Sequence, residues 1–149
     1  NLESIKKNIN QKSKNDVNKG KLEIIERNKQ VILRFPEKVT FQSGSAELNE
    51  NIKLVIKRVR SIVKESPELQ KIVVAGHTDN VPIYNEFFSS NWELSAARAV
   101  SVVHSLLDTA QIDKNLVMAV GSADTEPIAP NTDSANRAAN RRVEIKLEF

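Results

Sequence analysis

The chain has 149 residues and a formal net charge of +3, with 40% hydrophobic and 28% charged residues. This is the composition of a globular protein, and at this length one domain that buries roughly 70% of its unfolded surface is the default. Cysteine is absent, which excludes disulfides, thiolate metal sites and cysteine nucleophiles. The four glycines are not spaced as in G-x-G-x-x-G or P-loop motifs, so nucleotide-phosphate loops of those types are excluded as well.

The excess positive charge lies in the N-terminal segment. Residues 1–20 carry five lysines against two acidic residues, whereas the rest of the chain is balanced, with 17 basic and 17 acidic side chains. Leu2, Ile5 and Ile9 follow a helical spacing, which predicts a weakly amphipathic helix or tether outside the main core. Its lysines have two interpretations, attraction to an acidic surface or a solvated linker, and charge runs favour the second.

The next segments alternate between strand and helix patterns. Residues 21–26 and 30–35 are β-rich runs separated by a short polar turn, which predicts a hairpin. The apolar residues from Leu48 to Val63 recur with a helical period, and Ser66-Pro67 should end that helix. Residues 71–76 form a continuous apolar run, which is typical of a strand covered on both faces.

A second helix should begin near Ser90 or Asn91, because Ser90 and Glu93 have the spacing of a capping box. Its expected apolar stripe is Trp92, Ala96, Ala99, Val103, Leu106 and Ala110. Residues 116–120 predict a short buried strand, and residues 143–149 alternate as a strand with one face in water. The order β-β-α-β-α-β, a short helix and a last β predicts an α+β two-layer sandwich, a mixed sheet with helices mainly on one side.

No apolar run approaches the roughly 20 residues that span a bilayer, so any membrane anchor is expected outside this sequence. The chain begins at Asn1 without an initiator Met or a signal-like apolar stretch. It is therefore expected to be a fragment or a processed form.

Polar residues gather just beyond the predicted strand 71–76 and on one face of the second helix. Thr78 and Asp79 follow the carboxyl end of that strand, where ligand sites in α/β layers are common. Asn91, Ser95 and Arg98 share one helical face, interpreted as polar and outside the core. Asp79 and Arg98 on opposite walls of one cleft would fit a ligand that carries both an ammonium and a carboxylate. The alternative is that these two side chains simply pair with each other.

Three arginines, Arg137, Arg141 and Arg142, precede the last strand. They would either close the cleft or bind a polyanion, or form a solvated turn in which they pair with Glu144 or other carboxylates. Without further context the second interpretation is favoured.

Four motifs occur in an order that resembles a known family. They are Gly76-His77-Thr78-Asp79, Asn91-x-x-Leu94-Ser95-x-x-Arg98-Ala99, Pro127 to Asn131, and Asn140-Arg141-Arg142-Val143-Glu144-Ile145. Together they resemble the OmpA-like peptidoglycan-binding domain. The stretches 76–83 and 88–95 are similar to those of MotB-type flagellar motor stator B subunits. The resemblance covers residues 35–149 and implies the OmpA-like βαβαβ core, whereas residues 1–34 would be a membrane-proximal linker on the plug side.

The resemblance also implies a ligand and a set of roles. Asp79 and Arg98 would grip the ammonium and carboxylate of a diamino acid in the peptidoglycan stem peptide. Supporting hydrogen bonds would come from Thr78, Asn91, Ser95, Arg137 and Arg141, and which arginine contacts the ligand stays open. Residues 122–124, at the expected cleft wall after the third strand, depart from the family pattern, where relatives often have an aromatic residue or a second glycine.

At the level of the whole protein, the resemblance implies a stator anchor. The domain would bind peptidoglycan noncovalently as the periplasmic part of a single-pass inner-membrane protein. It would work as a homodimer, beside a stator A subunit that the missing membrane segment contacts, and without a cofactor. The alternative is the wall-anchoring domain of another envelope protein, of the outer-membrane porin or peptidoglycan-associated lipoprotein type. Alanine at Asp79 or Arg98 is expected to abolish wall binding and to leave the fold intact.

Two other function classes are disfavoured. His77 with Asp79 as a metal or acid–base site would make an enzyme, but His104 has no ligand spacing to His77 and no G-x-S-x-G or H-E-x-x-H motif is present. Nucleic-acid binding is disfavoured by the balanced charge and by the 5% aromatic content.

Overall fold

The computed structural model describes residues 2–109 and 111–149, and its elements follow the predicted order. The hairpin, the two long helices, the buried strand and the alternating last strand are all present, with ends shifted by a few residues. The elements are α1 (Leu2–Asn18), β1 (Glu23–Arg27), β2 (Gln30–Pro36), α2 (Glu37–Thr40), α3 (Glu50–Lys64), β3 (Lys71–His77), α4 (Asn91–Leu106), the 3₁₀ turn η1 (Lys114–Leu116), β4 (Val117–Gly121), α5 (Ser134–Asn140) and β5 (Arg142–Glu148).

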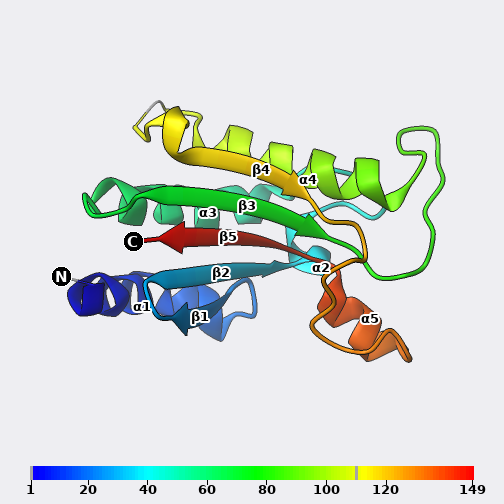
Figure 1. Cartoon of the computed structure of the whole chain (residues 1–149), viewed down its shortest axis with the longest axis horizontal. Helices are drawn as coiled ribbons and strands as arrows, with labels where there is room; N and C mark the ends of the chain where they lie inside the picture. Colours follow the sequence, from blue (N-terminus) through cyan, green and yellow to red (C-terminus); the bar gives the residue numbers. More distant parts are fainter. Residues whose placement is uncertain (1, 110) are drawn as a thin grey trace.

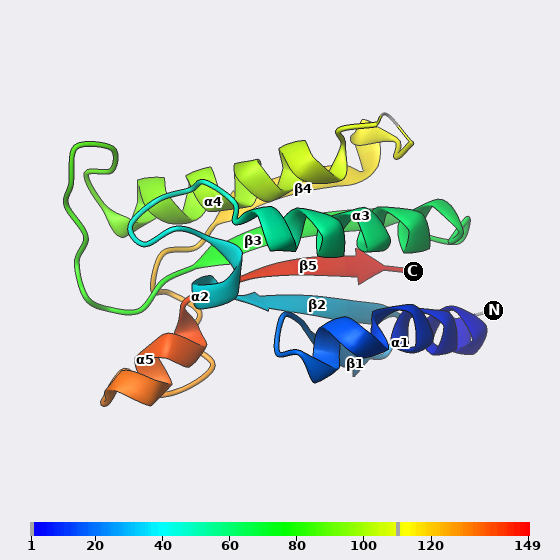
Figure 2. The same cartoon turned by 180° about the vertical axis from the view of Figure 1, so that it is seen from behind.

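The strands form one mixed sheet in the order β1-β2-β5-β3-β4. Only β3 and β4 run parallel, and α4 connects them, whereas the other neighbours are antiparallel. Figure 1 shows the sheet in front of the helices, and Figure 2, from behind, shows α1, α3 and α4 over the same face. The two-layer α+β architecture with helices mainly on one side is therefore confirmed.

The core lies between the sheet and these helices. Alternate residues of the central strands point toward the helices and are fully buried, as the two-residue period of a strand requires. In β2 they are Val31, Leu33 and Phe35, in β5 they are Val143, Ile145 and Leu147, and in β3 they are Ile72 and Val74. The stripe of α3 closes the other side of this core with residues such as Ile52, Ile56 and Ile62.

The N-terminal helix forms as predicted, but the prediction that it lies outside the core is wrong. Ile5 and Ile9 are buried and belong to the main hydrophobic cluster. Near the end of α1, Asp16 is also buried, and both of its oxygens accept hydrogen bonds from Arg58 of α3, at 2.7 and 2.6 Å. The narrow apolar stripe of α1 is enough to pack the helix against the core, because the bidentate ion pair with Arg58 neutralises the Asp16 carboxylate that this packing buries.

The hairpin that follows α1 is part of the main sheet, and residues 34 and 35 lie within the same strand, β2. The expected boundary between a linker (residues 1–34) and the family domain (residues 35–149) therefore falls inside a strand and does not divide the sheet. As a boundary of the family it stays a prediction.

The buried face of α4 differs from the predicted stripe. Ala99 and Leu106 are buried as expected, but Trp92 is 55% exposed, Ala96 is exposed and Val103 is only partly buried. Ala110 lies outside the described residues. The buried residues of the helix are Leu94, Ser95, Arg98, Ala99, Val102 and Leu106.

The cause of this rotation is the close approach of α4 to two strand glycines. A Cβ added at Gly76 would lie 2.1 Å from the carbonyl oxygen of Ser95, and one at Gly121 would lie 2.5 Å from the backbone nitrogen of Ala96. The helix backbone therefore rests directly on the ends of β3 and β4, as glycine permits. This contact places the first turns of α4 beside the loop that follows β3.

The last strand does not have the predicted wet face. Arg142 and Glu144 point away from the helices, yet each is only 4% exposed. They are covered because β5 is a central strand, and Arg34 of the neighbouring β2 donates to Glu144 at 2.8 Å. The alternation of polar and apolar residues identified β5 correctly. The polar residues on its outer face are buried because side chains of the neighbouring strands cover them.

Candidate functional site

A cleft opens at the carboxyl end of β3, at the edge of the sheet where the long loop and α5 lie (Figure 1). Its volume is about 240 Å³, and its walls come from four separate stretches of the chain. The lining residues are Glu37, Ser43, Gly44, Thr78, Asp79, Val81, Pro82, Ile83, Asn91, Leu94 and Arg141. The sequence placed Thr78, Asp79 and Asn91 here, and the structure brings all three together.

Asp79 is the buried anion of the cleft, only 7% exposed. Its Oδ1 accepts a hydrogen bond from the backbone N–H of Val81 at 3.0 Å, and its Oδ2 accepts one from Arg141 at 2.7 Å. The hydroxyl of Thr78 donates to the carbonyl oxygen of Asp79 at 2.9 Å. These bonds fix Asp79 just beyond the carboxyl end of β3, with Oδ2 of its carboxylate directed toward Arg141.

The start of α4 holds the loops around Asp79. Ser90 caps the helix by accepting from the N–H of Trp92 at 3.1 Å, so the predicted start of the helix is confirmed. The side-chain amide of Asn91 donates to the carbonyl oxygen of Val81 at 3.0 Å. Ser95 is fully buried and accepts from the N–H of Ala123 at 3.0 Å. Ser95 therefore acts on the cleft wall through the backbone and is not open to a ligand.

Ala123 closes the wall after β4. Its carbonyl oxygen accepts from the N–H of Thr78 at 2.8 Å, and its φ of 49° lies in the left-handed region that favours glycine. The hydrogen bond to Thr78 joins this part of the wall to the end of β3.

Arg98 does not line the cleft, and its interpretation as a side chain outside the core is wrong. It is only 3% exposed, its Nε donates to the carbonyl oxygen of Ser45 at 2.8 Å, and its guanidinium lies 4.7 Å from the ring centre of Phe41. Its ion-pair partner is Glu37 and not Asp79. Neither the facing arrangement of Asp79 and Arg98 nor their direct pairing is what the structure contains.

Glu37 is the site residue that the sequence gave no reason to select. One oxygen of its carboxylate accepts from Arg98, and the other accepts from Nε of Arg141 at 2.9 Å. Its backbone N–H also donates to the carbonyl oxygen of Arg141 at 3.0 Å. Glu37 therefore connects the buried guanidinium of Arg98 to Asp79 through Arg141.

The three arginines of the C-terminal motif have different surroundings. Arg141 lies in the cleft with a side chain that is 33% exposed. Arg142 lies on the outer face of the sheet and pairs with Glu144 at 3.1 Å, as the favoured interpretation expected, although the pair is buried and not solvated. Arg137 is half-buried on α5 and forms no ion pair with a carboxylate in the described part of the chain.

The charges in and directly behind the cleft are balanced. Asp79 and Glu37 carry two negative charges, and Arg98 and Arg141 carry two positive ones. Burial alone would lower the pKa of Arg141, but hydrogen bonds and charge from Asp79 and Glu37 raise it above its ordinary value. Arg141 is therefore a permanent cation beside a carboxylate, in a cavity that a small polar group can enter.

His77 lies behind the site, on the outer face of the sheet. Both imidazole nitrogens are buried without a hydrogen-bond partner among the described residues, and Nε2 is 3.6 Å from Glu144. Burial and the positive charge of Arg142 lower the pKa of His77 to about 4. The folded protein therefore keeps this imidazole neutral where an unfolded chain would begin to protonate it.

The free energy of unfolding should consequently decrease as the pH is lowered, at pH values where most carboxylates are still ionised. A lowered histidine pKa in the folded state means that its contribution is complete above about pH 6.5 and is lost as the pH falls toward 4. We expect a loss of about 2 kcal/mol in the free energy of unfolding between pH 7.5 and pH 5. Urea unfolding at both pH values measures it, and His77→Gln should remove most of the difference. An equal pH dependence in both proteins would contradict this origin.

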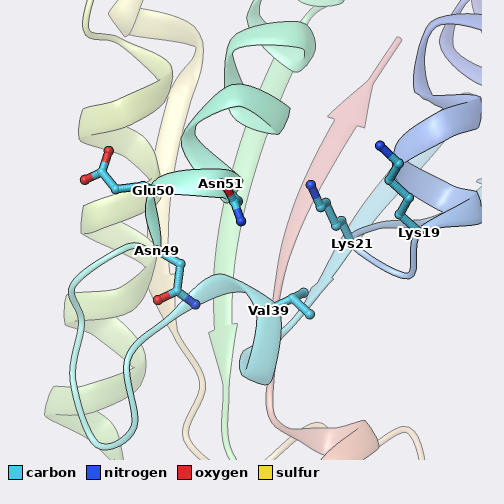
Figure 3. A pocket seen from close by; sticks show the side chains of 6 residues that line it. All are labelled: Lys19, Lys21, Val39, Asn49, Glu50 and Asn51. Atoms are coloured by element: carbon cyan, nitrogen blue, oxygen red, sulfur yellow. The ribbon is translucent and has the colours of Figure 1, made fainter.

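A second cavity, of about 430 Å³, lies between α1 and the start of α3 (Figure 3). Lys19 and Lys21 extend into it from one side, and Asn51 faces them from the other. None of the predicted site residues lines it. Glu50 also lines it but pairs with Lys53, so among the described residues this cavity has no ion pair like that between Asp79 and Arg141.

Two further structural findings bear on the class of site. Within residues 2–109 and 111–149, no group of three or more His, Asp or Glu side chains is placed to hold a metal ion. In the same part of the chain, no helix has both the length and the apolar character needed to cross a membrane.

Comparison with known proteins finds relatives in sequence and in structure. It is 30% identical to Motility protein B of Bacillus subtilis over 98% of this chain and 56% of that protein, and it spans only about half the length of the curated relatives it matches. Two solved structures are similar, a MotB-like protein from Desulfovibrio vulgaris (TM-score 0.88, 31% identity, 98% of this chain and 90% of that one) and the cell wall anchor of the T6SS from Pseudomonas aeruginosa (TM-score 0.85, 29% identity, 93% and 95%).

The OmpA family model matches residues 40–141, which include the whole loop after β3, α4, Arg137 and Arg141. With more than half of the chain matched, and with the cleft formed by the motifs that carry the resemblance, the chain belongs to the OmpA family.

Proposed function

We propose that the cleft at Asp79 binds peptidoglycan noncovalently, through the free end of a diamino acid in the stem peptide. The observation that carries this proposal is the pair of opposed charges, Asp79 and Arg141, 2.7 Å apart in one cavity. An amino-acid end carries an ammonium and a carboxylate, which complement those two groups. Membership of the OmpA family supports the same ligand.

In this proposal the residues of the site have separate roles. Asp79 receives the ammonium, and Arg141 receives the carboxylate. Thr78, Asn91 and Ser95 hold the backbone around Asp79, because their hydrogen bonds all go to main-chain atoms. Arg98 is a positioning residue that acts through Glu37. Arg137 contributes positive charge near the site from α5 without an ion pair of its own in the described residues.

We further propose that this domain anchors the stator of a flagellar motor to the cell wall. Similarity to Motility protein B and to a MotB-like structure supports this. The domain would then be periplasmic, joined to one inner-membrane helix, beside a stator A subunit, and present as a homodimer. The start of α1 and the end of β5 lie on the side of the sheet opposite the long loop and α5 (Figure 1), so an anchor there leaves the cleft facing the wall.

A second candidate is a wall anchor of another envelope system. The structure of the T6SS cell wall anchor from Pseudomonas aeruginosa matches at a TM-score of 0.85, as closely as the stator-type structures do. Chromosomal Asp79→Asn separates the two candidates, since loss of swimming with normal secretion favours the stator role. In both cases we propose binding without catalysis.

Co-sedimentation with purified peptidoglycan tests the proposed binding. Residues 1–149 should pellet with the polymer in a saturable way, and free meso-diaminopimelate should return the protein to the supernatant. Protein that stays in solution, or pelleting that diaminopimelate does not affect, would contradict the proposal. Release of soluble muropeptides would favour an enzyme instead.

A further inference from the structure

The positive charge of the chain is concentrated on two helices that are separate in sequence. Together α1 and α3 carry nine Lys and Arg side chains and three acidic ones, whereas the rest of the chain carries thirteen and sixteen. The two helices therefore have a net charge of +6, and the remaining residues one of −3. The sequence located the excess only in residues 1–20, because it treated α3 as a separate element.

Folding brings the charges of the two helices onto one surface. Both helices cover the same face of the sheet (Figure 2), and two ion pairs join α1 to α3 and its end, Asp16–Arg58 at 2.6 Å and Lys12–Glu65 at 2.5 Å. We call the exposed side of the two helices the basic helix face. Its exposed residues include Lys7, Lys14, Lys53, Leu54, Lys57, Arg58 and Lys64.

The cations of this face point away from the core. Lys7 and Lys14 lie on the side of α1 opposite the buried Ile9. Lys57 lies on the side of α3 opposite the buried Val59. These three lysines form no ion pair with any carboxylate in residues 2–109 and 111–149. Their charge is not cancelled within the fold and is spread along both helices, which suits an extended array of negative charges.

An exposed leucine lies among these cations. Leu54 is 57% exposed, and its neighbours three and four residues further along α3 are Lys57 and Arg58. A soluble polyanion offers this side chain nothing. At a bilayer surface, in contrast, an apolar side chain reaches the acyl boundary while the cations beside it meet the headgroups. The combination therefore favours a bilayer over a soluble polymer.

We propose that the basic helix face docks on a lipid bilayer that carries anionic phospholipids. This inference goes beyond the proposed function and does not depend on it, because no residue that lines the cleft at Asp79 belongs to α1 or α3. One domain thus has separate surfaces for two components of a cell envelope. The cleft takes a polar ligand at the end of β3, and the helices take a charged membrane surface.

Co-sedimentation with vesicles tests this docking. Residues 1–149 should pellet with phosphatidylcholine vesicles that contain roughly one-third phosphatidylglycerol and stay in solution with pure phosphatidylcholine. Raising the salt concentration from about 0.1 M to about 0.5 M should release the protein, because the attraction is screened. Equal binding to both kinds of vesicle, or binding to neither, would overturn the proposal.

Two triple variants with the same net charge separate the basic helix face from charge in general. Changing Lys7, Lys14 and Lys57 to Gln should weaken binding to the anionic vesicles roughly 100-fold. The matched control loses the same charge from exposed positions outside both helices and should bind within about threefold of the wild type. Its substitutions are Lys29→Gln, Lys71→Gln and Lys114→Gln. If the two triple variants lose binding equally, the helix face has no special role.

A tryptophan at position 54 measures the contact directly. Trp92 is the single tryptophan of the chain, so Leu54→Trp in a Trp92→Phe background gives one fluorescent reporter on α3. Its emission should shift to the blue when anionic vesicles are added. Met118→Trp in the same background places the reporter on the edge strand β4, where Met118 is 49% exposed, and should not shift. A shift at position 118 and none at position 54 would contradict the assigned surface.

The outcomes keep this inference distinct from the proposed function. Protein that binds vesicles but not peptidoglycan would contradict the proposed function and leave the docking in place. Protein that binds peptidoglycan but not anionic vesicles would overturn the docking alone. Soluble polyphosphate serves as a further probe, because binding to it without binding to vesicles would replace the bilayer by a soluble polyanion.

Discussion

Arg98→Ala should lower the free energy of unfolding by about 3–5 kcal/mol, because it removes one partner of a buried ion pair. The guanidinium is 3% exposed and pairs with Glu37, and its Nε satisfies the carbonyl oxygen of Ser45. Alanine would leave both acceptors without this donor and a cavity beneath Phe41. This replaces the expectation that Arg98→Ala leaves the fold intact.

Urea unfolding of Arg98→Ala at neutral pH measures the loss, with Arg27→Ala as the matched control. Arg27 is exposed on β1, so its loss should change the free energy of unfolding by less than about 0.5 kcal/mol. The double variant Arg98→Met, Glu37→Gln should recover part of the stability, since it removes the buried charges together. A single Arg98→Ala variant as stable as the wild type would mean that the pair contributes little.

Asp79→Asn should weaken peptidoglycan binding by roughly 10- to 100-fold, because the charge-assisted contact with the ligand's ammonium is lost. Asparagine has nearly the same shape, and its Oδ1 can still accept the N–H of Val81. Arg141 keeps Glu37 as a partner and is partly exposed, so stability should change by only about 1 kcal/mol.

Co-sedimentation across a range of peptidoglycan concentrations gives the change in affinity for Asp79→Asn. Asp108→Asn removes the same charge from an exposed position just beyond the far end of α4 and should bind as the wild type does. If both variants bind equally well, Asp79 is not the receptor of the ammonium. If Asp79→Asn binds weakly but is also unfolded in its circular dichroism spectrum, the assignment of a binding role to this carboxylate is not supported.

The two sets of variants also distinguish residues that stabilise the fold from residues that bind the ligand, although all of them belong to one connected group of charges. Arg98 and Glu37 are expected to affect stability first, whereas Asp79 and Arg141 are expected to affect affinity first. The order follows burial: Arg98 is 3% exposed and the side chain of Arg141 is 33% exposed.

Several features were predictable from the sequence because their causes are local. The capping box at Ser90 and Glu93 depends on residues three apart, and it fixed the start of α4. The apolar run of residues 71–76 identified β3, and its end placed Thr78 and Asp79 at the site. Motif order was enough to indicate the OmpA family, whose model matches residues 40–141.

The errors concern which side of an element faces the core. The period of α4 was correct, but its buried face was rotated, because Gly76 and Gly121 allow the helix backbone to rest on the strands. The helix α1 was expected outside the core, because its apolar stripe is narrow and residues 1–20 carry five lysines. No spacing near Asp16 indicated the ion pair that accompanies its burial. Its partner Arg58 is 42 residues away.

By itself, the sequence determined the order of the elements, the family and the position of Asp79, since each depends on residues close together in the chain. Only the tertiary structure decided which cation meets Asp79. Glu37 lies 61 residues from Arg98 and 104 from Arg141, so no spacing could reveal that it holds both. Ion pairs form between side chains that folding brings within a few ångströms, and here folding buries Arg98 and leaves Arg141 in the cleft.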